Sequence, residues 1–249
     1  MISKNAGRLG TTLPDVLGTT ALVTRRVASG LLHVMARCDV TGLENVPSTG
    51  ACLIVFNQLS FFDTALVPTI IPRPDITGPV ARSYRRNWFF RFLIEAGGGV
   101  WIQRGAGDRA ALRTQLEALR RGWMVGISPE GQRSRTGGLI RAKPGVAFLA
   151  YRAGVPILPM AFTNTAGIGP ALRRLRRATV SVRIGEPFEL PPLGRADRKR
   201  QRQDAADLIM CRLALLLPPE YRGVYADYPE VVDRLPSVRR GTTPDHAAE

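Results

Sequence analysis

Apolar and polar positions repeat along this chain in two different periods, and the two periods predict helices and strands in turn. Residues 14–37 carry apolar side chains at helical spacing, interrupted by arginines, and predict an amphipathic helix. Residues 51–57 form a continuous apolar run, typical of a strand covered on both faces. The remaining pattern predicts strands at 38–47 (with a turn), 76–82, 99–105, 123–131, 155–164 and 177–190, and helices at 63–70, 88–98, 108–122, 143–154 and 197–218.

This alternation of strand and helix predicts an α/β fold, with a mixed, largely parallel sheet flanked by helices. Pro79 weakens the strand at 76–82, because proline cannot donate to a ladder. Neither a flexible linker nor an internal repeat divides the chain. We therefore expect an N-terminal amphipathic helical segment at 1–40, one α/β domain at 41–218, and a polar C-terminal tail at 219–249.

The net charge of +15, carried mostly by arginine, points to an anionic partner. Arginine favours bidentate contact with phosphate or carboxylate, so a membrane surface or a phosphorylated substrate fits. The basic residues form no aromatic-rich nucleic-acid module, which argues against a nucleic-acid binder. The alternative is an arginine-rich composition with many surface arginines of no special role.

No apolar stretch reaches the ~18 residues that a spanning helix requires, and no secretory leader is apparent. The basic helix at 14–37 can lie flat in a bilayer interface or dock on its own core, and the pattern leaves both open. Cys38, Cys52 and Cys211 have no metal-like spacing, which favours thiols in a reducing compartment. With only His33 and His246, a multi-histidine metal site is not expected.

Three polar clusters follow predicted strands, at residues 57–63, 103–104 and 129–134. In a parallel sheet such strand ends share one edge and form sites there. Asp63 can cap the next helix or orient a catalytic partner. Glu130 can pair with Arg133, and Arg104 and Arg133 together can form an anion site. Each cluster alone says little.

In order and spacing, the clusters resemble the glycerolipid acyltransferase family, which includes the bacterial 1-acylglycerol-3-phosphate acyltransferases. The family's first motif, N-H-x-S-x-x-D, is matched by Asn57, Ser60 and Asp63, with Gln58 at the histidine position. Its second, G-x-x-F-I-x-R, is similar to residues 98–104, which end in Arg104. The third, E-G-T-R-S, is matched by Glu130, Gly131, Arg133 and Ser134, and the fourth, V-P-I-x-P, by residues 155–159. The resemblance covers about residues 45–190.

The resemblance implies transfer of a fatty acyl group from acyl-CoA or acyl carrier protein to a hydroxyl of a lysophospholipid-type acceptor. It implies that the motif histidine is the general base, that Asp63 orients it, and that Arg104, Glu130 and Arg133 bind the acceptor's glycerol phosphate. It also implies that Asn57, Ser60, Gly131 and Ser134 belong to the same substrate-binding site. No metal or bound cofactor is implied, and the expected location is cytoplasmic, peripheral on the inner face of the cell membrane.

Gln58 departs from the family at the centre of this mechanism, because an amide has no titratable group near neutral pH. Three explanations stay open: a natural paralogue with lost or altered activity, a base supplied by another residue such as His33, or an engineered inactivating change. The sequence thus predicts an acyltransferase of phospholipid biosynthesis or remodelling. The alternative is an impaired relative that binds lipid or acyl-thioester without turnover.

Overall fold

The computed structural model describes residues 13–14, 17–102, 108–194 and 197–227, and its core is one seven-stranded sheet in the order β1-β7-β6-β2-β5-β3-β4. Every neighbouring pair is parallel except β6 with β7. The mixed, largely parallel sheet predicted from the sequence is therefore confirmed. The strands are β1 (Ala36–Thr41), β2 (Cys52–Phe56), β3 (Ile76–Ala81), β4 (Gly99–Ile102), β5 (Met124–Ile127), β6 (Ile157–Thr163) and β7 (Ala178–Ile184).

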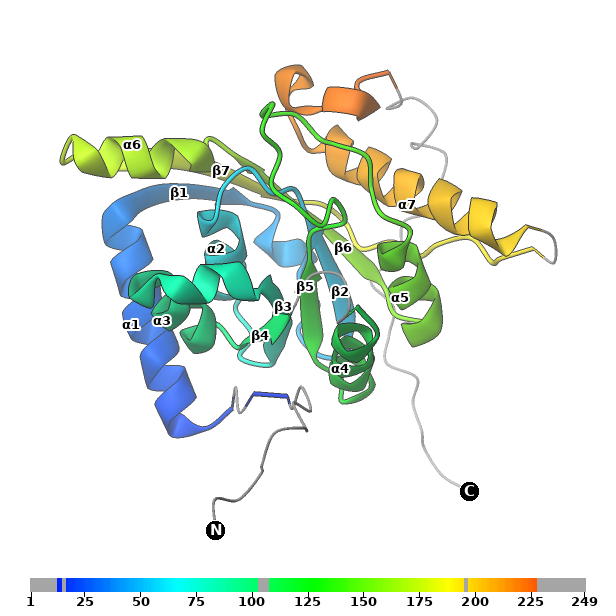
Figure 1. The fold of residues 1–249 in the computed structure, drawn as a ribbon, viewed down its shortest axis with the longest axis horizontal. Helices are drawn as coiled ribbons and strands as arrows, with labels where there is room; N and C mark the ends of the chain where they lie inside the picture. Colours follow the sequence, from blue (N-terminus) through cyan, green and yellow to red (C-terminus); the bar gives the residue numbers. More distant parts are fainter. Residues whose placement is uncertain (1–12, 15–16, 103–107, 195–196, 228–249) are drawn as a thin grey trace, which may run out of the picture.

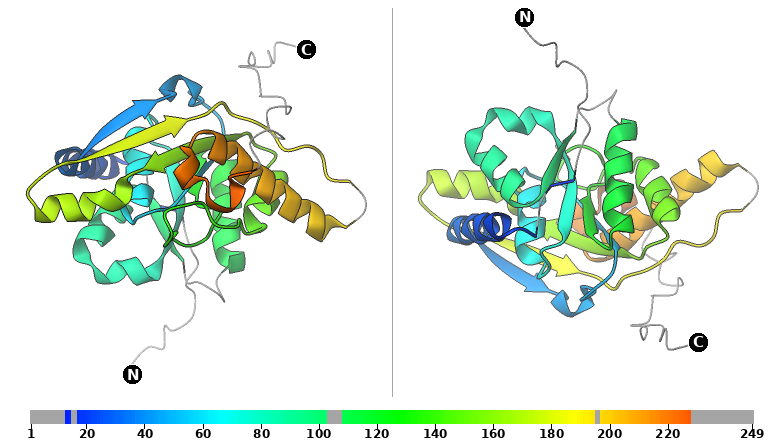
Figure 2. Two further views of the ribbon diagram at one scale, coloured as in Figure 1. Left: turned by 90° about the horizontal axis from the view of Figure 1, so that it is seen from above. Right: turned by 90° about the horizontal axis from the view of Figure 1, so that it is seen from below.

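Helices cover both faces of the sheet and make a three-layer sandwich (Figures 1 and 2). One face packs against α4 (Asp108–Arg120), α5 (Gly145–Ala153) and α7 (Arg198–Leu215). The other packs against α1 (Thr19–Met35), α2 (Phe62–Ile70), α3 (Trp88–Ala96) and α6 (Ile168–Arg173). Short 3-10 turns are η1 (Leu43–Asn45), η2 (Arg82–Arg86), η3 (Thr165–Gly167), η4 (Pro219–Tyr221) and η5 (Gly223–Tyr225).

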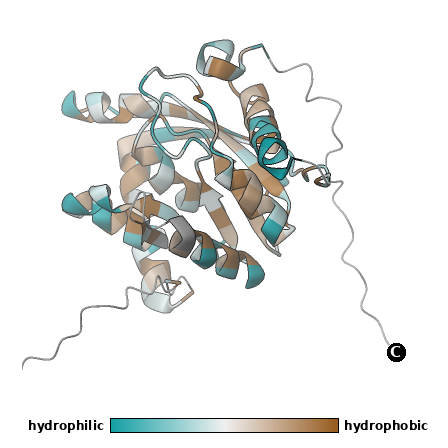
Figure 3. Ribbon diagram, turned by 45° about the vertical axis from the view of Figure 1, so that its right-hand side comes forward, coloured by the Kyte–Doolittle hydropathy of each residue, from teal (hydrophilic) through white to brown (hydrophobic). Residues whose placement is uncertain are grey.

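Strand β2 is buried on both faces, as its continuous apolar run predicts. Leu53 and Val55 enter the cluster beneath α5 and α7, whereas Ile54 and Phe56 enter the cluster beneath α1 and α2. Figure 3 shows the hydrophobic colouring gathered in the central strands. This double burial fixes the register of β2 and hence the position of the polar residues that follow it.

Strand β1 begins earlier than predicted, at Ala36, so the helix expected at 14–37 ends at Met35. Ala36 is buried and pairs with Ala178 of β7, and this long-range pairing overrides the local helical pattern. Pro79 is tolerated because β3 pairs with β5 only through Ile76 and Thr77. The missing N–H of Pro79 therefore costs no bond on that side.

Helix α1 both docks on the core and exposes apolar residues. Ala28 and Leu32 are buried in the cluster shared with α2 and α3. On its outer side Val23, Val27 and Val34 are more than half exposed. No helix in the described ranges is both long enough and apolar enough to cross a bilayer.

The described part of the predicted tail, up to residue 227, packs against the loop that follows β5. The Tyr225 hydroxyl donates to Asp207 of α7 at 2.7 Å and accepts the Ala142 N–H at 3.0 Å. The Leu139 N–H donates to the Tyr221 carbonyl at 2.9 Å. Residues 219–227 therefore hold the loop that connects β5 to α5.

Candidate active site

The polar residues after β2 and β5 meet at one crevice in the sheet. The two strands are parallel neighbours, so their carboxyl ends lie at the same edge. The helices that follow them, α2 and α5, pack on opposite faces. A crevice opens between strands whose connections diverge in this way, and it is the usual site position in open α/β sheets.

Gln58 of the first motif and the third motif form one hydrogen-bonded unit. The Gln58 backbone N–H donates to Glu130 Oε1 at 3.2 Å, and the Gln58 carbonyl accepts the Ser134 N–H at 2.8 Å. Glu130 Oε2 accepts the Ile140 N–H at 3.3 Å, so both carboxylate oxygens are engaged. The structure thus brings together two segments that are seventy-two residues apart in the chain.

Asp63 holds the loop that leads into α2. Its Oδ2 accepts the backbone N–H groups of Leu59 and Ser60, both at 2.6 Å. The Ser60 hydroxyl accepts the Phe62 N–H at 3.0 Å. These bonds fix the backbone from Leu59 to Phe62, where the loop passes into α2. Asp63 lies in the first turn of that helix, where a carboxylate is favoured by the helix dipole.

The two acidic side chains of the site are almost inaccessible, with exposed fractions of 0% for Asp63 and 1% for Glu130. Burial raises the pKa of Asp63 to about 7, against the hydrogen bonds from Ser60 and Leu59 that favour its charged form. Burial likewise raises the pKa of Glu130 to about 7, and the nearby charge of Asp63 adds to the rise. Both carboxyl groups therefore change protonation close to neutral pH.

The side chains of Gln58 and Asp63 have separate partners. Gln58 Nε2 donates to the Thr64 hydroxyl at 3.2 Å, and no hydrogen bond joins it to the Asp63 carboxylate. Asn57 turns away from both and exchanges two hydrogen bonds with the backbone of Phe162, at 2.8 and 2.7 Å. Asn57 thereby ties the end of β2 to the end of β6.

A cavity of about 570 Å³ adjoins Gln58. Apolar residues make most of its wall, among them Val80 of β3, Leu112 of α4 and Leu149 of α5. Its polar lining consists of Gln58, Thr64, Tyr84, Gln115, Ser128 and Lys143. A large apolar hollow with a few polar groups is the usual form of a lipid or small-molecule site.

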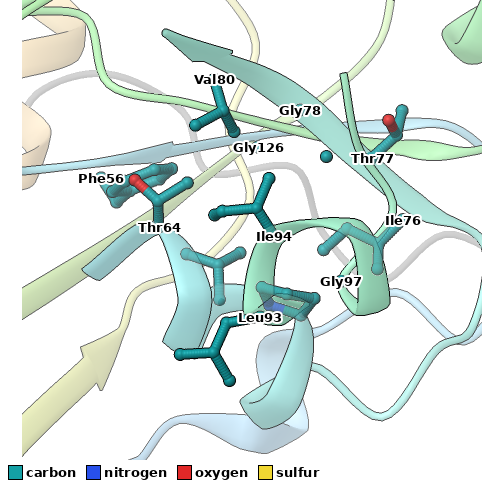
Figure 4. Close-up of a pocket in the computed structure, with 13 residues that line it drawn as sticks. Phe56, Thr64, Ile76, Thr77, Gly78, Val80, Leu93, Ile94, Gly97 and Gly126 are labelled. Atoms are coloured by element: carbon teal, nitrogen blue, oxygen red, sulfur yellow. The ribbon is translucent and has the colours of Figure 1, made fainter. Parts of the chain in front are cut away.

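A second cavity, of about 30 Å³, shares Phe56, Thr64 and Val80 with the large one. Figure 4 shows it between the end of α3 and the strands β3 and β5, with Gly78 and Gly126 along one side. A Cβ on Gly78 would lie 2.4 Å from the Gly126 carbonyl oxygen, so no larger residue fits there. The small cavity therefore depends on two closely approaching strand backbones.

Several residues of the site were not predicted from the sequence, among them Lys143, Tyr84 and Ser128. Lys143 lines the cavity and lies over Gly131, where an added Cβ would come within 2.9 Å of its Nζ. Tyr84 lines the cavity and lies 5.8 Å from the Arg133 guanidinium carbon, at cation–π distance. The buried Ser128 hydroxyl has no hydrogen-bond partner among the described residues. The signal available for Lys143 was a basic residue directly before the Pro-Gly start of a helix.

The other residues predicted from the sequence add few contacts to the site in the described structure. Arg104 lies outside the described residues. Glu130 and Arg133 form no ion pair within the described ranges. His33 bonds to the Ser29 carbonyl on α1 and does not line the cavity. The part of the chain that the structure describes contains no cluster of His, Cys, Asp and Glu suited to a metal.

Comparison with known proteins supports the family that the sequence resembles. The Acyltransferase family profile matches residues 37–163. The chain is 28% identical to the 1-acyl-sn-glycerol-3-phosphate acyltransferase of Salmonella typhimurium, over 59% of this chain and 60% of that protein. It is 29% identical to the chloroplastic enzyme BAT2 of Brassica napus, over 65% of this chain and 48% of that protein.

A lyso-ornithine lipid O-acyltransferase of Pseudomonas aeruginosa is 28% identical, over 64% of this chain and 67% of that protein. The matched region spans about half to three-fifths of the first two relatives. Among solved structures, the 1-acyl-sn-glycerophosphate acyltransferase PlsC of Thermotoga maritima shares the fold, with a TM-score of 0.55, 24% identity and 76% coverage of each chain. With more than half of its residues matched by the family profile, the chain belongs to the Acyltransferase family.

Proposed function

We propose that the protein transfers a fatty acyl group from acyl-CoA or acyl carrier protein to a hydroxyl of a glycerophospholipid-type acceptor. The observation that carries this proposal is the mainly apolar cavity that adjoins Gln58, at the crevice where the first and third motifs are hydrogen-bonded. Such a cavity suits an acyl chain, and its polar lining suits a reacting ester. The relatives' names support a lipid acceptor of this class.

In the proposed reaction, the acceptor hydroxyl oxygen attacks the thioester carbonyl carbon. A carbon–oxygen bond forms, the carbon–sulfur bond breaks, and the hydroxyl proton ends on the departing thiol. Gln58 can orient the hydroxyl by hydrogen bonding but cannot remove its proton. Arg133 and Arg104 are proposed to bind the acceptor phosphate, together with Lys143, which lines the cavity. The proposed reaction requires no metal or bound cofactor.

Glu130 and Asp63 have a positioning role in this scheme. Glu130 fixes Gln58 and Ile140, and Asp63 fixes the Leu59–Ser60 turn. Each carboxylate oxygen of Glu130 and Asp63 already accepts a hydrogen bond from the protein. In the described contacts, neither Asp63 nor Glu130 therefore takes the place of the base that is missing at Gln58.

The protein is proposed to act while bound peripherally at the cytoplasmic face of an anionic membrane. The exposed valines of α1 and the net charge of +15 support this location. An amphipathic helix with basic residues binds such surfaces through apolar burial and attraction to anionic lipids.

A second function is favoured by Gln58 itself: binding of lipid or acyl-thioester without turnover. General-base assistance contributes about 10²–10⁴-fold in rate, so its loss can reduce transfer to a trace. The cavity and the acceptor-side cations do not depend on that base. Substrate binding would therefore survive the loss of transfer.

The decisive experiment measures thiol release from acyl-CoA and acyl carrier protein with a panel of lysophospholipid acceptors. The parent, Gln58→His and the matched control Gln132→His are compared, because Gln132 is exposed and lies in the same unit. Slow transfer by the parent that rises about 10²–10⁴-fold only in Gln58→His supports the proposal. If no variant transfers acyl groups while acyl-CoA still binds, the acyltransferase proposal fails and the binding function replaces it.

A further inference from the structure

The turn that ends α6 presents a fully exposed leucine among four exposed arginines. Leu175 is 97% exposed and is flanked by Arg173, Arg174, Arg176 and Arg177, all on the surface. We refer to residues 173–177 as the arginine–leucine tip. A single exposed leucine is ordinary, but this one stands alone at the centre of a dense cationic group.

The backbone conformation at position 175 is unfavourable for a leucine. Its φ is +53°, in the left-handed region that bulky residues rarely occupy. The Arg176 N–H donates to the Ala171 carbonyl and the Leu175 N–H to the Leu172 carbonyl, at 2.9 and 3.0 Å. These two bonds define a Schellman motif, in which glycine or asparagine is the favoured residue at the Leu175 position. Neither folding nor solubility gains from a leucine there.

The tip adjoins helix α1, whose exposed apolar side is proposed to contact the membrane. The Arg177 guanidinium donates to the carbonyl oxygens of His33 and Ala36, at the end of that helix. Val34, in the same turn of α1, is 71% exposed. Figures 1 and 2 show the outer end of α6 near the point where α1 passes into β1.

The tip also lies on the site's side of the sheet. Asn57 is bonded to Phe162 at the end of β6, and from there η3 leads directly into α6. Thr165 of η3 is fully buried and lies near Asp63. The tip therefore lies at the same edge of the sheet as the crevice that holds the proposed site.

We propose that the arginine–leucine tip inserts into an anionic lipid bilayer, with Leu175 in the acyl region and the arginines on lipid phosphates. Guanidinium groups bind phosphate bidentately, and none of the four pairs with a carboxylate of a described residue. A nucleic acid would use the arginines but would bury the leucine less completely than the acyl region of a bilayer. This inference rests on the proposed action at a membrane and adds a second contact point to α1.

Vesicle binding by three variants of the full chain tests the tip. Vesicles of phosphatidylcholine with and without phosphatidylglycerol are compared for Leu175→Asn, for Arg173→Gln/Arg174→Gln/Arg176→Gln, and for the control Leu43→Asn. Leu43 is 43% exposed in η1 and lies outside the tip. Arg177 is left unchanged because of its bonds to α1.

Leu175→Asn is expected to bind phosphatidylglycerol vesicles about tenfold more weakly, because one leucine is no longer buried in lipid. Its melting temperature should equal or exceed that of the parent, because asparagine tolerates a positive φ. The triple variant should lose affinity for the anionic vesicles and much of the salt dependence. Leu43→Asn should bind as the parent does.

The proposal is overturned if Leu175→Asn binds as tightly as the parent, or if both leucine variants weaken binding equally. Tighter binding of a single-stranded oligonucleotide that only the triple variant loses would assign the tip to nucleic acid instead. Acyl transfer to a short-chain acceptor dissolved as monomers separates the two proposals. If that transfer is absent in all of these variants and also in Gln58→His, the acyltransferase function fails while the vesicle result still decides the role of the tip.

Discussion

The backbone N–H of Gln58 donates to the Glu130 carboxylate at 3.2 Å, within a site whose two acidic side chains are both buried. Through this bond the two segments that carry the family motifs form one structural unit before any substrate binds. The carboxyl groups of Asp63 and Glu130 hold this unit together, and burial raises the pKa of each.

Removing the Glu130 carboxylate is expected to destabilise the fold. Glu130→Ala leaves the N–H groups of Gln58 and Ile140 without their acceptors, and a buried unsatisfied group costs about 1–3 kcal/mol. Glu130→Gln keeps one acceptor and should lose less. Denaturant unfolding measures both, with Gln132→Ala as a surface control expected within about 0.5 kcal/mol of the parent. A Glu130→Ala protein as stable as the parent would contradict the bridging role.

Asp63 is expected to make stability depend on pH. Its folded pKa of about 7 lies above the model-compound value of 3.8, so the folded state retains the proton more strongly than the unfolded chain. The stability contribution is complete below about pH 4 and is lost as the pH rises through 7. Asp63→Asn keeps an acceptor for the Leu59 and Ser60 N–H groups and removes this titration.

The measurement for Asp63 is the free energy of unfolding of parent and Asp63→Asn from pH 4 to 8. The difference between the two should shift in favour of the asparagine variant as the pH rises. A difference that is constant across this range would show that Asp63 does not titrate there. Circular dichroism at each pH verifies that both proteins start folded.

Arg73 is expected to be one of the most important polar side chains for stability. It is 6% exposed, pairs with Asp75, and donates to the carbonyl groups of Pro47, Gly50 and Gly122. Arg73→Met leaves a carboxylate and three carbonyls unpaired, and breaking a buried pair costs about 3–5 kcal/mol.

The matched control for Arg73 is Arg121→Met, whose ion pair with Glu117, at the end of α4, is more than half exposed. Exposed pairs of this spacing contribute about 0.3–0.5 kcal/mol. Thermal and denaturant unfolding of the two variants should therefore differ widely. Equal losses would mean that the bonds of Arg73 contribute little beyond ordinary side-chain packing.

Filling the large cavity is expected to change the preferred acyl chain. Ala111 on α4 is buried and lines the cavity, whereas its neighbour Ala110 is exposed. Ala111→Phe should lower the kcat/KM for long acyl donors on the order of tenfold relative to short ones. Ala110→Phe should leave the ratio unchanged. If Ala111→Phe slows all donors equally, the cavity does not hold the acyl chain.

Much of the fold could be predicted from periodicity. The apolar run of β2 and the leucine spacing of α4 were sufficient to identify both elements, because local burial patterns are encoded locally. The start of β1 and the short helix α6 were not predicted. Ala36 joins the sheet because β7 is beside it, and α6 is too short to show a repeat.

The sequence by itself predicted the α/β class and a motif pattern with Gln58 at the expected histidine position, since each of these is a matter of residue type and order. Only the tertiary structure decided that Glu130 accepts from Gln58, that Asp63 holds a turn, and that Lys143 lies over Gly131. These relationships depend on which strand ends become neighbours in the sheet. A contact across seventy-two residues is set by long-range packing, which leaves no periodic trace in the chain.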